Sequence, residues 1–347
     1  MRAIVFHTFG GPLSIEEIAD PSPPADGVVL RVTANGICRS DWHAWQGHDP
    51  DIVVPHVPGH ELAGEIVAVG RDVTRWHIGD RVTVPFVLGC GTCALCRHGQ
   101  PQVCEHQYQP GFTGLGSMAE YVSLPRADGN LVALPHDLDD ADAASLGCRF
   151  ATSYRAVVQQ ARVQPGQWLA VHGCGGVGLS AVMIGAALGA RVMAIDIHPE
   201  ALAMARRCGA EHLIDSRTTD PVRAVVELSS GGADVSIDAV GITETCVASI
   251  RSLRTHGRHV QVGLMLGAHT MPAVPIGLLH SREIELYGAH GMAAHSYPEM
   301  LSMVANGQLR PHELVTERMT LSAGLAHLGS MADYPGHGMA VITDLTG

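Results

Sequence analysis

The sequence predicts an α/β protein with two domains, one built mostly from β-strands and the other around a doubly wound parallel sheet. Three observations carry this prediction. The chain has 347 residues, which is enough for two hydrophobic cores. Its first part consists of short β-rich segments between Gly, Pro and Asp turns, whereas strand and helix patterns alternate after residue 167. Such alternation is typical of a parallel sheet with crossover helices.

The predicted strands of the first part are short, and they cover residues 1–6, 27–37, 64–70 and 80–87. The pattern changes near residue 139, where DDADAASLGCRFATSYRAVV indicates a helix with an acidic first turn, followed by a second helix. The segment ADPSPPADG is interpreted as a turn and not as an interdomain linker.

The alternating part begins at residue 167 with a buried strand, WLAVHG. Helices are predicted from VGLSAVMIGAALG and PEALAMARRCG, and further strands from ARVMAID, HLID, ADVSIDAV, RHVQVG and IELYGAH. After about residue 290 the chain returns to mixed helix and strand and ends in the strand-like GMAVITD.

Composition and charge exclude several classes of protein. Apolar residues make up 46% of the chain and charged residues 16%, which is typical of a globular protein and not of a disordered one. The formal net charge is −12, and the sequence has no basic block interleaved with aromatic residues, so nucleic acid is not an expected partner. The sequence contains no lysine, which excludes lysine Schiff-base chemistry and a Walker-type phosphate loop.

Targeting features are also missing from the sequence. The first residues, MRAIVFHTFGGP, lack the long apolar segment of a secretory signal, and the most apolar stretch, residues 177–190, is too short and too rich in glycine to span a bilayer. We therefore expect a cytoplasmic protein without a membrane partner. Its nine cysteines would stay reduced there, so clustered ones are interpreted as metal ligands before disulfides.

A glycine-rich turn, GCGGVG, follows the strand WLAVH and opens a helix. Gly173, Gly175 and Gly178 occupy the G-x-G-x-x-G positions, and the next strand ends in Asp196. In this context the first glycine permits the turn, the second lets the backbone approach a pyrophosphate, and the third lets helix and strand pack closely. Asp196 would accept hydrogen bonds from ribose hydroxyls, which favours NAD over NADP. The alternative is a plain glycine-rich turn with a capping aspartate.

Four cysteines, Cys90, Cys93, Cys96 and Cys104, follow a C-x2-C-x2-C-x7-C spacing. Four thiolates in one small loop match a closed tetrahedral zinc site. A [4Fe–4S] cluster is one alternative, but iron–sulfur sequences usually end in Cys-Pro, and Cys104 is followed by Glu105. Reduced cysteines without a metal are another alternative. The spacing therefore favours a structural zinc.

A second set of candidate metal ligands is scattered along the chain: Cys38 lies in GICRSDWH, His60 and Glu61 lie in VPGHELAG, and Cys148 lies in SLGCRFATSY. Two thiolates and one imidazole would leave a tetrahedral zinc with one open position, as in catalytic sites. Taken singly, Cys148 is more often a core cysteine and His60 a hydrogen-bonded histidine. The combination favours a catalytic zinc, so that two zinc ions are expected per chain.

The sequence resembles the zinc-containing medium-chain alcohol dehydrogenases along nearly its whole length. GHELAGEIVAVGRDV matches the zinc signature of that family, G-H-E-x-x-G-x5-G-x2-V, and the four-cysteine segment, the Cys148 segment and the glycine-rich turn follow in family order. The resemblance implies a GroES-like, mostly β catalytic domain over residues 1–149 and 289–347. It implies a Rossmann domain that binds NAD over residues 150–288.

The resemblance also implies the roles of the metal-site residues. Cys38, His60 and Cys148 correspond to the catalytic zinc ligands. Asp41 corresponds to a carboxylate that orients His60 and raises its basicity as a ligand. Glu61 corresponds to a flexible residue behind the metal.

The remaining polar residues of GICRSDWH correspond to catalytic and coenzyme-binding groups of the family. Ser40 would take the proton from the alcohol, and His43 would be the far end of the proton relay. The implied coenzyme-binding residues are Arg39 as a pyrophosphate clamp, with Thr152, Gly173, Gly175, Gly176, Val177, Gly178, Asp196, Val240, Val262, Gly263 and Leu264.

The implied function is an NAD-dependent zinc alcohol dehydrogenase, or a carbonyl reductase in the reverse direction, which acts on a small alcohol, aldehyde or ketone. Polyol dehydrogenases are related but often lack the four-cysteine segment. A non-catalytic NAD-binding redox sensor and an iron–sulfur electron carrier are alternatives from other classes. Predicted wall residues favour medium or bulky apolar alcohols; they are Trp42, Trp45, Phe86 and His290.

Two positions depart from the family pattern. Met339 replaces an arginine that often contacts the pyrophosphate, and Ala201 stands near the position of a lysine that often contacts the adenosine ribose. NAD would thus be held by fewer cations. The resemblance also predicts a homo-oligomer, with a tetramer favoured and a dimer, paired through the strand IELYGAH, as the alternative.

Overall fold

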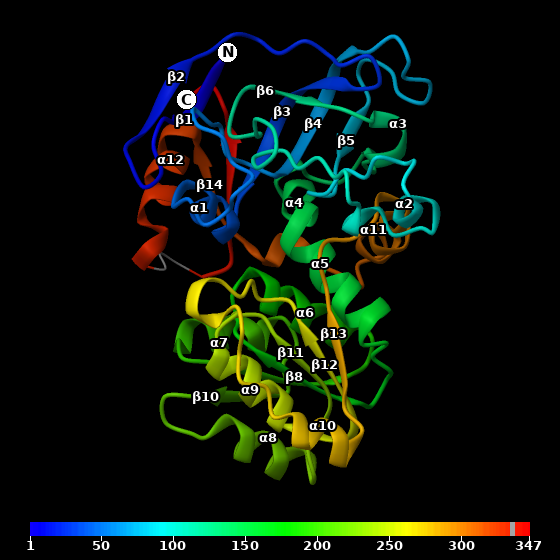
Figure 1. The fold of residues 1–347 in the computed structure, drawn as a ribbon, viewed down its shortest axis with the longest axis vertical. Coiled ribbons are helices and arrows are strands. Elements are labelled where there is room, and N and C mark those ends of the chain that lie inside the picture. Colours follow the sequence, from blue (N-terminus) through cyan, green and yellow to red (C-terminus); the bar gives the residue numbers. More distant parts are fainter. Residues whose placement is uncertain (334–336) are drawn as a thin grey trace. The chain divides into compact units, whose positions relative to one another are not determined.

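The computed structural model describes residues 1–333 and 337–347, which form two compact units (Figure 1). The first unit comprises Met1–Ala151, Gly291–Ala305 and Val315–Gly347, and the second comprises Thr152–His290 and Asn306–Leu314. No helix among the described residues is long and apolar enough to cross a membrane.

The contact pattern divides the chain differently from the sequence-based boundaries in one segment. The predicted division put all of residues 289–347 in the first domain, whereas Asn306–Leu314 packs with the second unit. One contact of this segment is a backbone N–H of Arg310 that lies 3.4 Å from the sulfur of Met183. The return of the chain to the first domain is therefore interrupted by a short excursion into the second.

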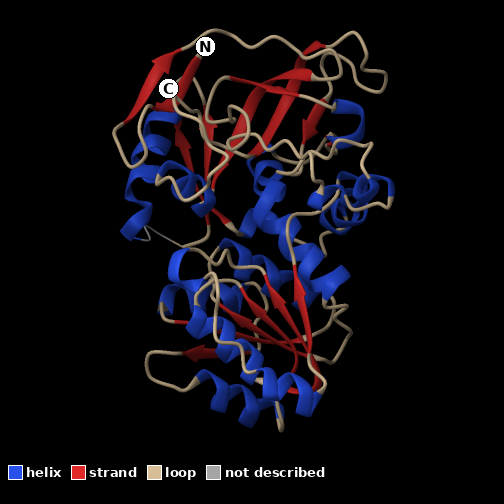
Figure 2. Cartoon of the chain, viewed as in Figure 1, coloured by secondary structure: helices blue, strands red, loops and turns tan. Residues whose placement is uncertain are grey.

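The first unit is built on a mostly antiparallel sheet, drawn in red in Figure 2. Its strands follow the order β14-β15-β3-β4-β5-β7, β6 pairs with β3, and β1 and β2 form a separate antiparallel pair. Among the described strand pairs of this sheet, β14 and β15 are parallel and the others are antiparallel. The strands are β1 (Arg2–Phe6), β2 (Leu13–Glu17), β3 (Val28–Ile37), β4 (Glu61–Val69), β5 (Arg81–Thr83), β6 (Tyr121–Leu124), β7 (Val132–Ala133), β14 (Val315–Thr320) and β15 (Met339–Asp344).

Alternation of apolar and polar residues explains which face of this sheet is buried. In β3, Leu30 and Val32 are buried, whereas Arg31 between them is exposed. Leu30 lies opposite Ile66 of β4, and both belong to the main core of the unit. Helix α12 adds two leucines to that core. The helices of the unit are α1 (Arg39–Trp45), α2 (Ala94–Arg97), α3 (Ala127–Asn130), α4 (Asp140–Ser145), α11 (Tyr297–Ala305) and α12 (Leu321–Ser330).

The segment expected to form two helices is one uninterrupted helical run. Asp139 caps α4 by accepting hydrogen bonds from the backbone N–H groups of residues 141 and 142, which explains the acidic start. Helix α4 continues directly into a π turn, Leu146–Phe150, then into α5 (Ala151–Tyr154) and a second π turn, Arg155–Gln160. The wider π turns change the helical phase without breaking the helix, which is why the sequence pattern resembled two helices.

The predicted doubly wound parallel sheet is confirmed in the second unit. Its described strands follow the order β10-β9-β8-β11-β12-β13, and every neighbouring pair is parallel. This is the 3-2-1-4-5-6 order of the Rossmann fold. The strands are β8 (Trp168–His172), β9 (Arg191–Asp196), β10 (His212–Asp215), β11 (Ala233–Asp238), β12 (Leu253–Gln261) and β13 (Glu285–Gly288).

The order of strands places a switch point between β8 and β11. The chain moves from β8 through β9 to β10, then crosses back to β11 and continues outward. Right-handed crossovers in opposite directions put helices on both faces and open a crevice at the carboxyl ends of β8 and β11. The helices are α6 (Gly176–Ala187), α7 (Pro199–Arg207), α8 (Pro221–Ser229), α9 (Thr243–Arg251) and α10 (Ile276–Arg282).

A polar network is buried in the core of the second unit. His172 on β8 and His259 on β12 are 1% and 2% exposed. Nδ1 of His259 lies 2.9 Å from Oγ of Ser249, which lies 2.5 Å from Oγ of Ser236. Burial lowers the pKa of His172 to about 3 and the pKa of His259 to about 4. Both imidazoles are therefore neutral in the folded chain near pH 7.

We expect the second unit to lose stability in mild acid because of these two histidines. Their folded pKa values lie below the ordinary 6.5. The unfolded state therefore binds more protons below pH 6.5, and stability falls as the pH decreases toward the folded values. Each imidazole would lower the free energy of unfolding by about 2 kcal/mol between pH 6.5 and pH 5. Urea unfolding at both pH values measures this, and His172→Leu should lose less stability than the wild type.

Val171→Ala is the matched control for the acid response. Val171 is buried on the same strand and carries no titratable group. The substitution should lower the free energy of unfolding by a similar amount at both pH values, because it removes buried methyl groups. An equal pH response in the wild type and in His172→Leu would contradict the role given to His172.

Candidate active site and metal centres

Four potential metal donors converge in the first unit: Cys38, His60, Glu61 and Cys148. One ligand atom from each lies within 4.8 Å of all the others. Strand pairing explains the approach of the first three, because β3 and β4 are antiparallel with Gly36 opposite Glu61. The π turn after α4 packs against β4 and adds Cys148. The structure thus brings together all four side chains selected from the sequence.

Asp41 orients the imidazole of His60. Oδ1 of this fully buried carboxylate lies 2.8 Å from Nδ1 of His60 and accepts the Gly59 N–H, and Oδ2 accepts the Cys38 N–H at 2.9 Å. Because an ionised carboxylate only accepts, Nδ1 carries a proton toward Asp41, and Nε2 is the ring nitrogen left for a metal. Nε2 is buried and has no hydrogen-bond partner among the described residues. A metal ion would satisfy this nitrogen.

The charges of this cluster are unbalanced without a cation. Cys148 donates a hydrogen bond to Cys38, which lowers the pKa of Cys38 well below its ordinary value and raises the pKa of Cys148 well above it. This contact therefore favours the charged form of Cys38 and the neutral form of Cys148. Burial would lower the pKa of His60, but the Asp41 carboxylate raises it well above its ordinary value. A bound dication would hold both thiolates and a neutral imidazole, and this donor set fits zinc.

Helix α1 carries the residues predicted for proton transfer. Cys38 is its N-cap, and Oγ of Ser40 lies 3.7 Å from the sulfur of Cys38. His43 follows three residues later on the same side of the helix and is half-buried. Its Nδ1 lies 2.9 Å from Nδ1 of His48, which is exposed. Ser40 therefore lies next to the donor cluster, and the His43–His48 pair lies farther along toward solvent.

Arg39 is held by its own unit in the described structure. Its guanidinium lies over the ring of Trp42, 4.3 Å from the ring centroid, and donates a hydrogen bond to the carbonyl of Met331. Stacking on an aromatic ring keeps the charge in a fixed place. Trp42 thus supports Arg39, whatever its role as a wall residue.

The other residues predicted to line a pocket differ in position. Phe86 packs edge-on against the ring of His60 at 6.1 Å, and Phe112, which was not predicted, lies 5.1 Å from the same ring. Trp45 donates to a backbone carbonyl and packs in a core cluster, so its role there is structural. His290 belongs to the second unit.

The four-cysteine segment forms a compact cluster of free thiols. All ligand atoms lie within 4.8 Å of one another, with 4.0 Å between Cys90 and Cys96 and 3.7 Å between Cys93 and Cys104. Backbone N–H groups point at the sulfurs at 3.3–3.4 Å, from residue 92 to 90, 93 to 90, 96 to 93, 90 to 104 and 106 to 104. Such N–H groups stabilise thiolates, and the arrangement fits a closed zinc site.

Hydrogen bonding makes part of this cluster acidic. The Thr92 hydroxyl and neighbouring backbone N–H groups lower the pKa of Cys90 to about 5, whereas burial raises the pKa of Cys96 to about 12.

The segment is fixed to the sheet domain by Asn130, whose side chain accepts the Gly89 N–H at 2.8 Å and donates to the Gly89 carbonyl at 3.1 Å.

The glycine-rich turn of the second unit has a steric reason for two of its glycines and an open approach at a third. Gly173 has φ +94°, and a Cβ there would lie 2.4 Å from Cγ2 of Val240. A Cβ at Gly178 would lie 1.7 Å from the Gly173 carbonyl oxygen. A Cβ at Gly175 would meet nothing within 4 Å, so the backbone there faces open space into which a pyrophosphate fits. The first backbone N–H groups of α6 belong to Gly176, Val177 and Gly178.

Asp196 has a second task that the sequence did not reveal. Its Oδ2 accepts the Cys174 N–H at 2.6 Å and its Oδ1 accepts the His198 N–H at 2.8 Å, so the carboxylate also fixes the glycine-rich turn. Asp215 lies opposite Asp196 in the sheet register, and the nearby Arg217 is bound to Asp215 at 2.8 Å. Two carboxylates therefore mark the end of these strands, and Arg217 is already neutralised.

The loops after β11 and β12 are joined at the same edge of the sheet. The Asp238 carbonyl accepts the N–H groups of Val262 at 3.0 Å and Gly263 at 2.8 Å, and its carboxylate accepts the Val240 N–H at 3.0 Å. Val240 and Leu264 are 42% and 55% exposed. Because the carboxyl ends of neighbouring parallel strands meet at one edge, these apolar residues lie beside the glycine-rich turn.

Three further positions selected from the sequence are buried. Thr152 is 7% exposed in α5, and the next residue, Ser153, donates to the Val177 carbonyl at 2.7 Å, which fixes this helix to the start of α6. Ala201 and Met339, the two departures from the family pattern, are 3% and 0% exposed. Both residues are uncharged as well as buried, so neither position offers a cation to the coenzyme.

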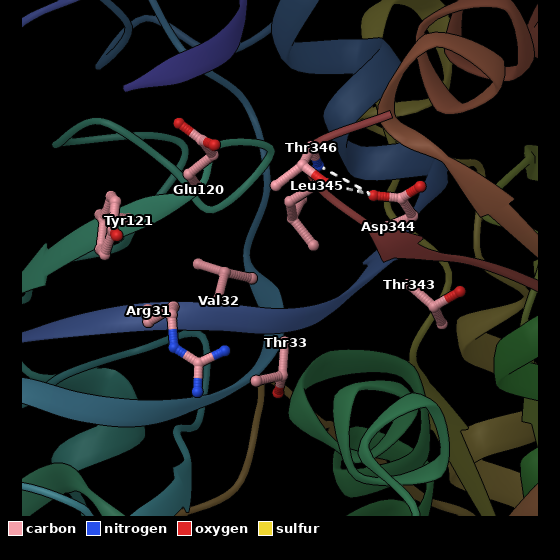
Figure 3. A pocket seen from close by; sticks show the side chains of 9 residues that line it. All are labelled: Arg31, Val32, Thr33, Glu120, Tyr121, Thr343, Asp344, Leu345 and Thr346. Atoms are coloured by element: carbon pink, nitrogen blue, oxygen red, sulfur yellow. Dashed lines mark hydrogen bonds between the residues drawn. The ribbon is translucent and has the colours of Figure 1, made fainter.

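A surface cavity of about 330 Å³ lies elsewhere on the first unit (Figure 3). None of its lining residues belongs to the predicted sites, and its charged groups are already engaged, Arg31 with Glu65 and Asp344 with Thr346. We assign no function to it. The lining residues are Arg31, Val32, Thr33, Glu120, Tyr121, Thr343, Asp344, Leu345 and Thr346.

Three residues around these sites were not predicted from the sequence. Arg149 binds Glu61 inside the donor cluster, and its signal was a charged residue directly after Cys148 in an otherwise apolar stretch. His48 extends the polar chain beyond His43. Phe112 packs against His60 but lies far from it in the sequence, so no local pattern could have indicated it.

Comparisons with known proteins agree with this geometry. The alcohol dehydrogenase GroES-like domain model matches residues 24–136, and the zinc-binding dehydrogenase model matches residues 176–306. An alcohol dehydrogenase of Rhizobium meliloti is 34% identical over 90% of each chain, and an NAD-dependent alcohol dehydrogenase of Sulfurisphaera tokodaii is 31% identical over 99% of each chain. The solved alcohol dehydrogenase of Thermus sp. ATN1 is 31% identical over 99% of each chain, with a TM-score of 0.89.

The fold and the two donor clusters define the class of protein: a dehydrogenase with a Rossmann unit and zinc-binding centres. The chain belongs to the zinc-containing medium-chain alcohol dehydrogenase family, as its similarity to curated members over nearly their whole length shows.

Proposed function

We propose that the chain is an NAD-dependent zinc alcohol dehydrogenase, which also reduces the corresponding aldehyde or ketone in the reverse direction. The observation that carries the proposal is the meeting of Cys38, His60 and Cys148 beside the Ser40 hydroxyl. Two thiolates and one imidazole hold a metal and leave one position for substrate. The cluster of four cysteines would instead fill all four positions of a tetrahedral zinc, and we propose that this second metal stabilises the fold.

The chemistry divides between the cofactors and the chain. Bound zinc supplies a Lewis acid that lowers the pKa of an alcohol, and bound NAD supplies the acceptor for hydride. Asp41 keeps His60 in the tautomer that offers Nε2. Ser40 accepts a hydrogen bond from the substrate hydroxyl and passes its proton on.

The positions of Ser40 and His43 on helix α1, and of His48 just beyond it, support a proposed proton relay. In the family the two ends of the relay are connected through the coenzyme ribose, and we propose the same connection here. Burial, followed by the charges of Arg39 and His48, lowers the pKa of His43 to about 4. His43 is therefore neutral near pH 7 and can accept a proton in transit. The exposed His48, 2.9 Å away, offers the next group toward solvent.

Replacing His43 with glutamine should lower the kcat for alcohol oxidation by about tenfold to a hundredfold near pH 7, at the low end of general-base effects. The effect stays moderate because water reaches this part of the helix. The deficit should shrink as the pH rises, because hydroxide can then remove the proton. Steady-state kinetics between pH 6 and pH 10 measure both features, and an external imidazole buffer should restore part of the rate.

His48→Gln is the matched variant for the relay. His48 is more exposed than His43, so water can replace it and the loss should be smaller. The double variant should be little worse than His43→Gln alone, because both residues serve one path. A His43→Gln enzyme with the rate and pH profile of the wild type would remove the relay from the mechanism.

The coenzyme is proposed to bind at the carboxyl edge of the parallel sheet. The N–H groups at the start of α6 favour the pyrophosphate, and Asp196 keeps lone pairs for ribose hydroxyls. The exposed Val240 and Leu264 offer apolar surface to the nicotinamide ring. Other residues proposed to contact NAD are Arg39, Thr152, Gly173, Gly175, Gly176, Val177, Gly178, Val262 and Gly263.

Reduction of NAD by a panel of alcohols, and oxidation of NADH by a panel of aldehydes and ketones, test the proposed activity. Phe86 and Phe112 beside His60 favour medium or bulky apolar alcohols over short ones. No turnover with any alcohol or carbonyl compound, despite tight NAD binding and full zinc content, would favour a redox sensor. A coloured, iron-containing protein would favour an electron carrier.

A homo-oligomer and a cytoplasmic location remain proposals. Strand β13 ends the order of the parallel sheet, and its Leu286 is 41% exposed. An exposed edge of this kind can pair with the same strand of a second chain across a two-fold axis. Light scattering would distinguish the favoured tetramer from a dimer.

A further inference from the structure

The catalytic donor cluster contains one donor more than the proposed function needs. Glu61 lies within the same 4.8 Å as Cys38, His60 and Cys148. Four protein donors would close a tetrahedral zinc and leave no position for an alcohol. An active site of the proposed kind therefore requires that Glu61 be kept away from the metal.

Arg149 occupies both oxygens of the Glu61 carboxylate. Its backbone N–H donates to Oε1 at 2.9 Å, its Nε lies 3.0 Å from each oxygen, and its Nη2 donates to Oε2. The two side chains are 8% and 0% exposed. A bidentate pair of this kind fixes the plane of the carboxylate, and separating it would take a buried guanidinium away from its carboxylate partner.

The fold supplies room and direction for this pair. A Cβ at Gly36 would lie 2.5 Å from Oε2 of Glu61 and 3.2 Å from Nη2 of Arg149, so the pair fills the space that a side chain on β3 would take. The π turn presents Cys148 and Arg149, which are consecutive, to the same cluster. One donates a sulfur, and the other restrains the carboxylate.

We propose that Arg149 is a positioning residue that restrains Glu61, so that Cys38, His60 and Cys148 alone bind the catalytic zinc. This inference rests on the proposed function, since it explains how the fourth position stays open. According to this proposal, the number of protein ligands on the zinc depends on Arg149, because Arg149 holds the Glu61 carboxylate away from the metal.

Cobalt substitution tests the number of ligands directly, because the visible d–d spectrum of Co²⁺ reports coordination number and donor type. We expect Arg149→Gln to change the spectrum of the catalytic site as the carboxylate enters, and to lower kcat by about tenfold to a hundredfold. The double variant Arg149→Gln/Glu61→Gln should return both toward wild type, because no carboxylate remains to bind. Arg149→Lys, with one charge but no planar fork, should lie between. The four-cysteine site contributes equally to all spectra and cancels in the differences.

The variants separate positioning from a merely structural role. A cobalt spectrum that stays unchanged in Arg149→Gln, or changes equally in the single and double variants, would overturn the proposal. Glu61→Gln alone covers the case in which Arg149→Gln does not fold: it should keep the wild-type cobalt spectrum, and an altered spectrum would mean that Glu61 already binds the metal. Alcohol oxidation by the wild-type protein, measured in the same preparation, tests the proposed function separately.

Discussion

Replacing Cys38 with serine should reduce kcat/KM for alcohol oxidation by about a thousandfold or more, while the protein stays folded and binds NAD. Lewis-acid assistance is worth several kcal/mol, and about 1.4 kcal/mol corresponds to a factor of ten. Cys38 lies beyond the end of β3, so the strand pairing that forms the domain does not depend on its sulfur. Steady-state kinetics measure the loss of kcat/KM, NAD titration checks that the folded chain still binds the coenzyme, and metal analysis counts the zinc that remains. His60→Ala should behave in the same way.

Cys93→Ser and Cys104→Ser are the matched controls, since they remove a donor from the other cluster. A closed structural zinc contributes to folding, so these variants should lower the unfolding temperature, while kcat per folded molecule changes much less than in Cys38→Ser. Near-normal turnover in Cys38→Ser, or equal losses of kcat in both sets, would show that the catalytic and structural roles are wrongly assigned.

The second large effect concerns coenzyme choice: NAD should be preferred over NADP by about a hundredfold or more in kcat/KM. Asp196 and the neighbouring Asp215 repel a 2′-phosphate, and Arg217 is neutralised by Asp215. The residues after Asp196 are Ile197, His198 and Pro199, and none is an arginine. Kinetics with both coenzymes at one pH measure the ratio.

Two substitutions distinguish the charge of Asp196 from its hold on the glycine-rich turn. Asp196→Asn removes the charge but keeps one oxygen, which can accept only one of the two backbone N–H groups, so the NAD preference should shrink and the turn should be loosened in part. Asp196→Ala also frees the Cys174 N–H and should weaken NAD binding further. Equal efficiency with both coenzymes in the wild type would mean that other residues recognise the ribose.

The two-domain α/β fold was predictable because its signals are local. Alternating strand and helix patterns indicated the parallel sheet, and the spacing of GCGGVG after a strand indicated the tight turn, in which a Cβ at Gly178 would lie 1.7 Å from the Gly173 carbonyl oxygen. The helical run after Asp139 was not predicted correctly, since a π turn has no distinct composition and only shifts the periodicity. The excursion of Asn306–Leu314 depends on tertiary contacts such as that of Arg310 with Met183, which a linear pattern does not contain.

The metal ligands of the candidate site could be predicted, because few side chains bind zinc and their spacing in the sequence is characteristic. Thiols and an imidazole in recognisable spacings indicated both clusters, which the structure brings together. The restraint on Glu61 was not predictable, because the sequence around a single arginine in a helix does not indicate which distant carboxylate it will bind. The second task of Asp196 likewise depends on backbone N–H groups, which every sequence has.

The π turn after α4 makes this stretch of the chain intolerant of changes in length. Removing one residue from a helix rotates everything beyond it by about 100° about the axis. Cys148 and Arg149 would then turn away together, and the metal would lose a ligand at the moment Glu61 lost its restraint. Substitutions can alter these two functions one at a time, but a deletion cannot. In a library of single-codon deletions, we expect residues 140–150 to yield no active clones, whereas exposed loops should tolerate the same change.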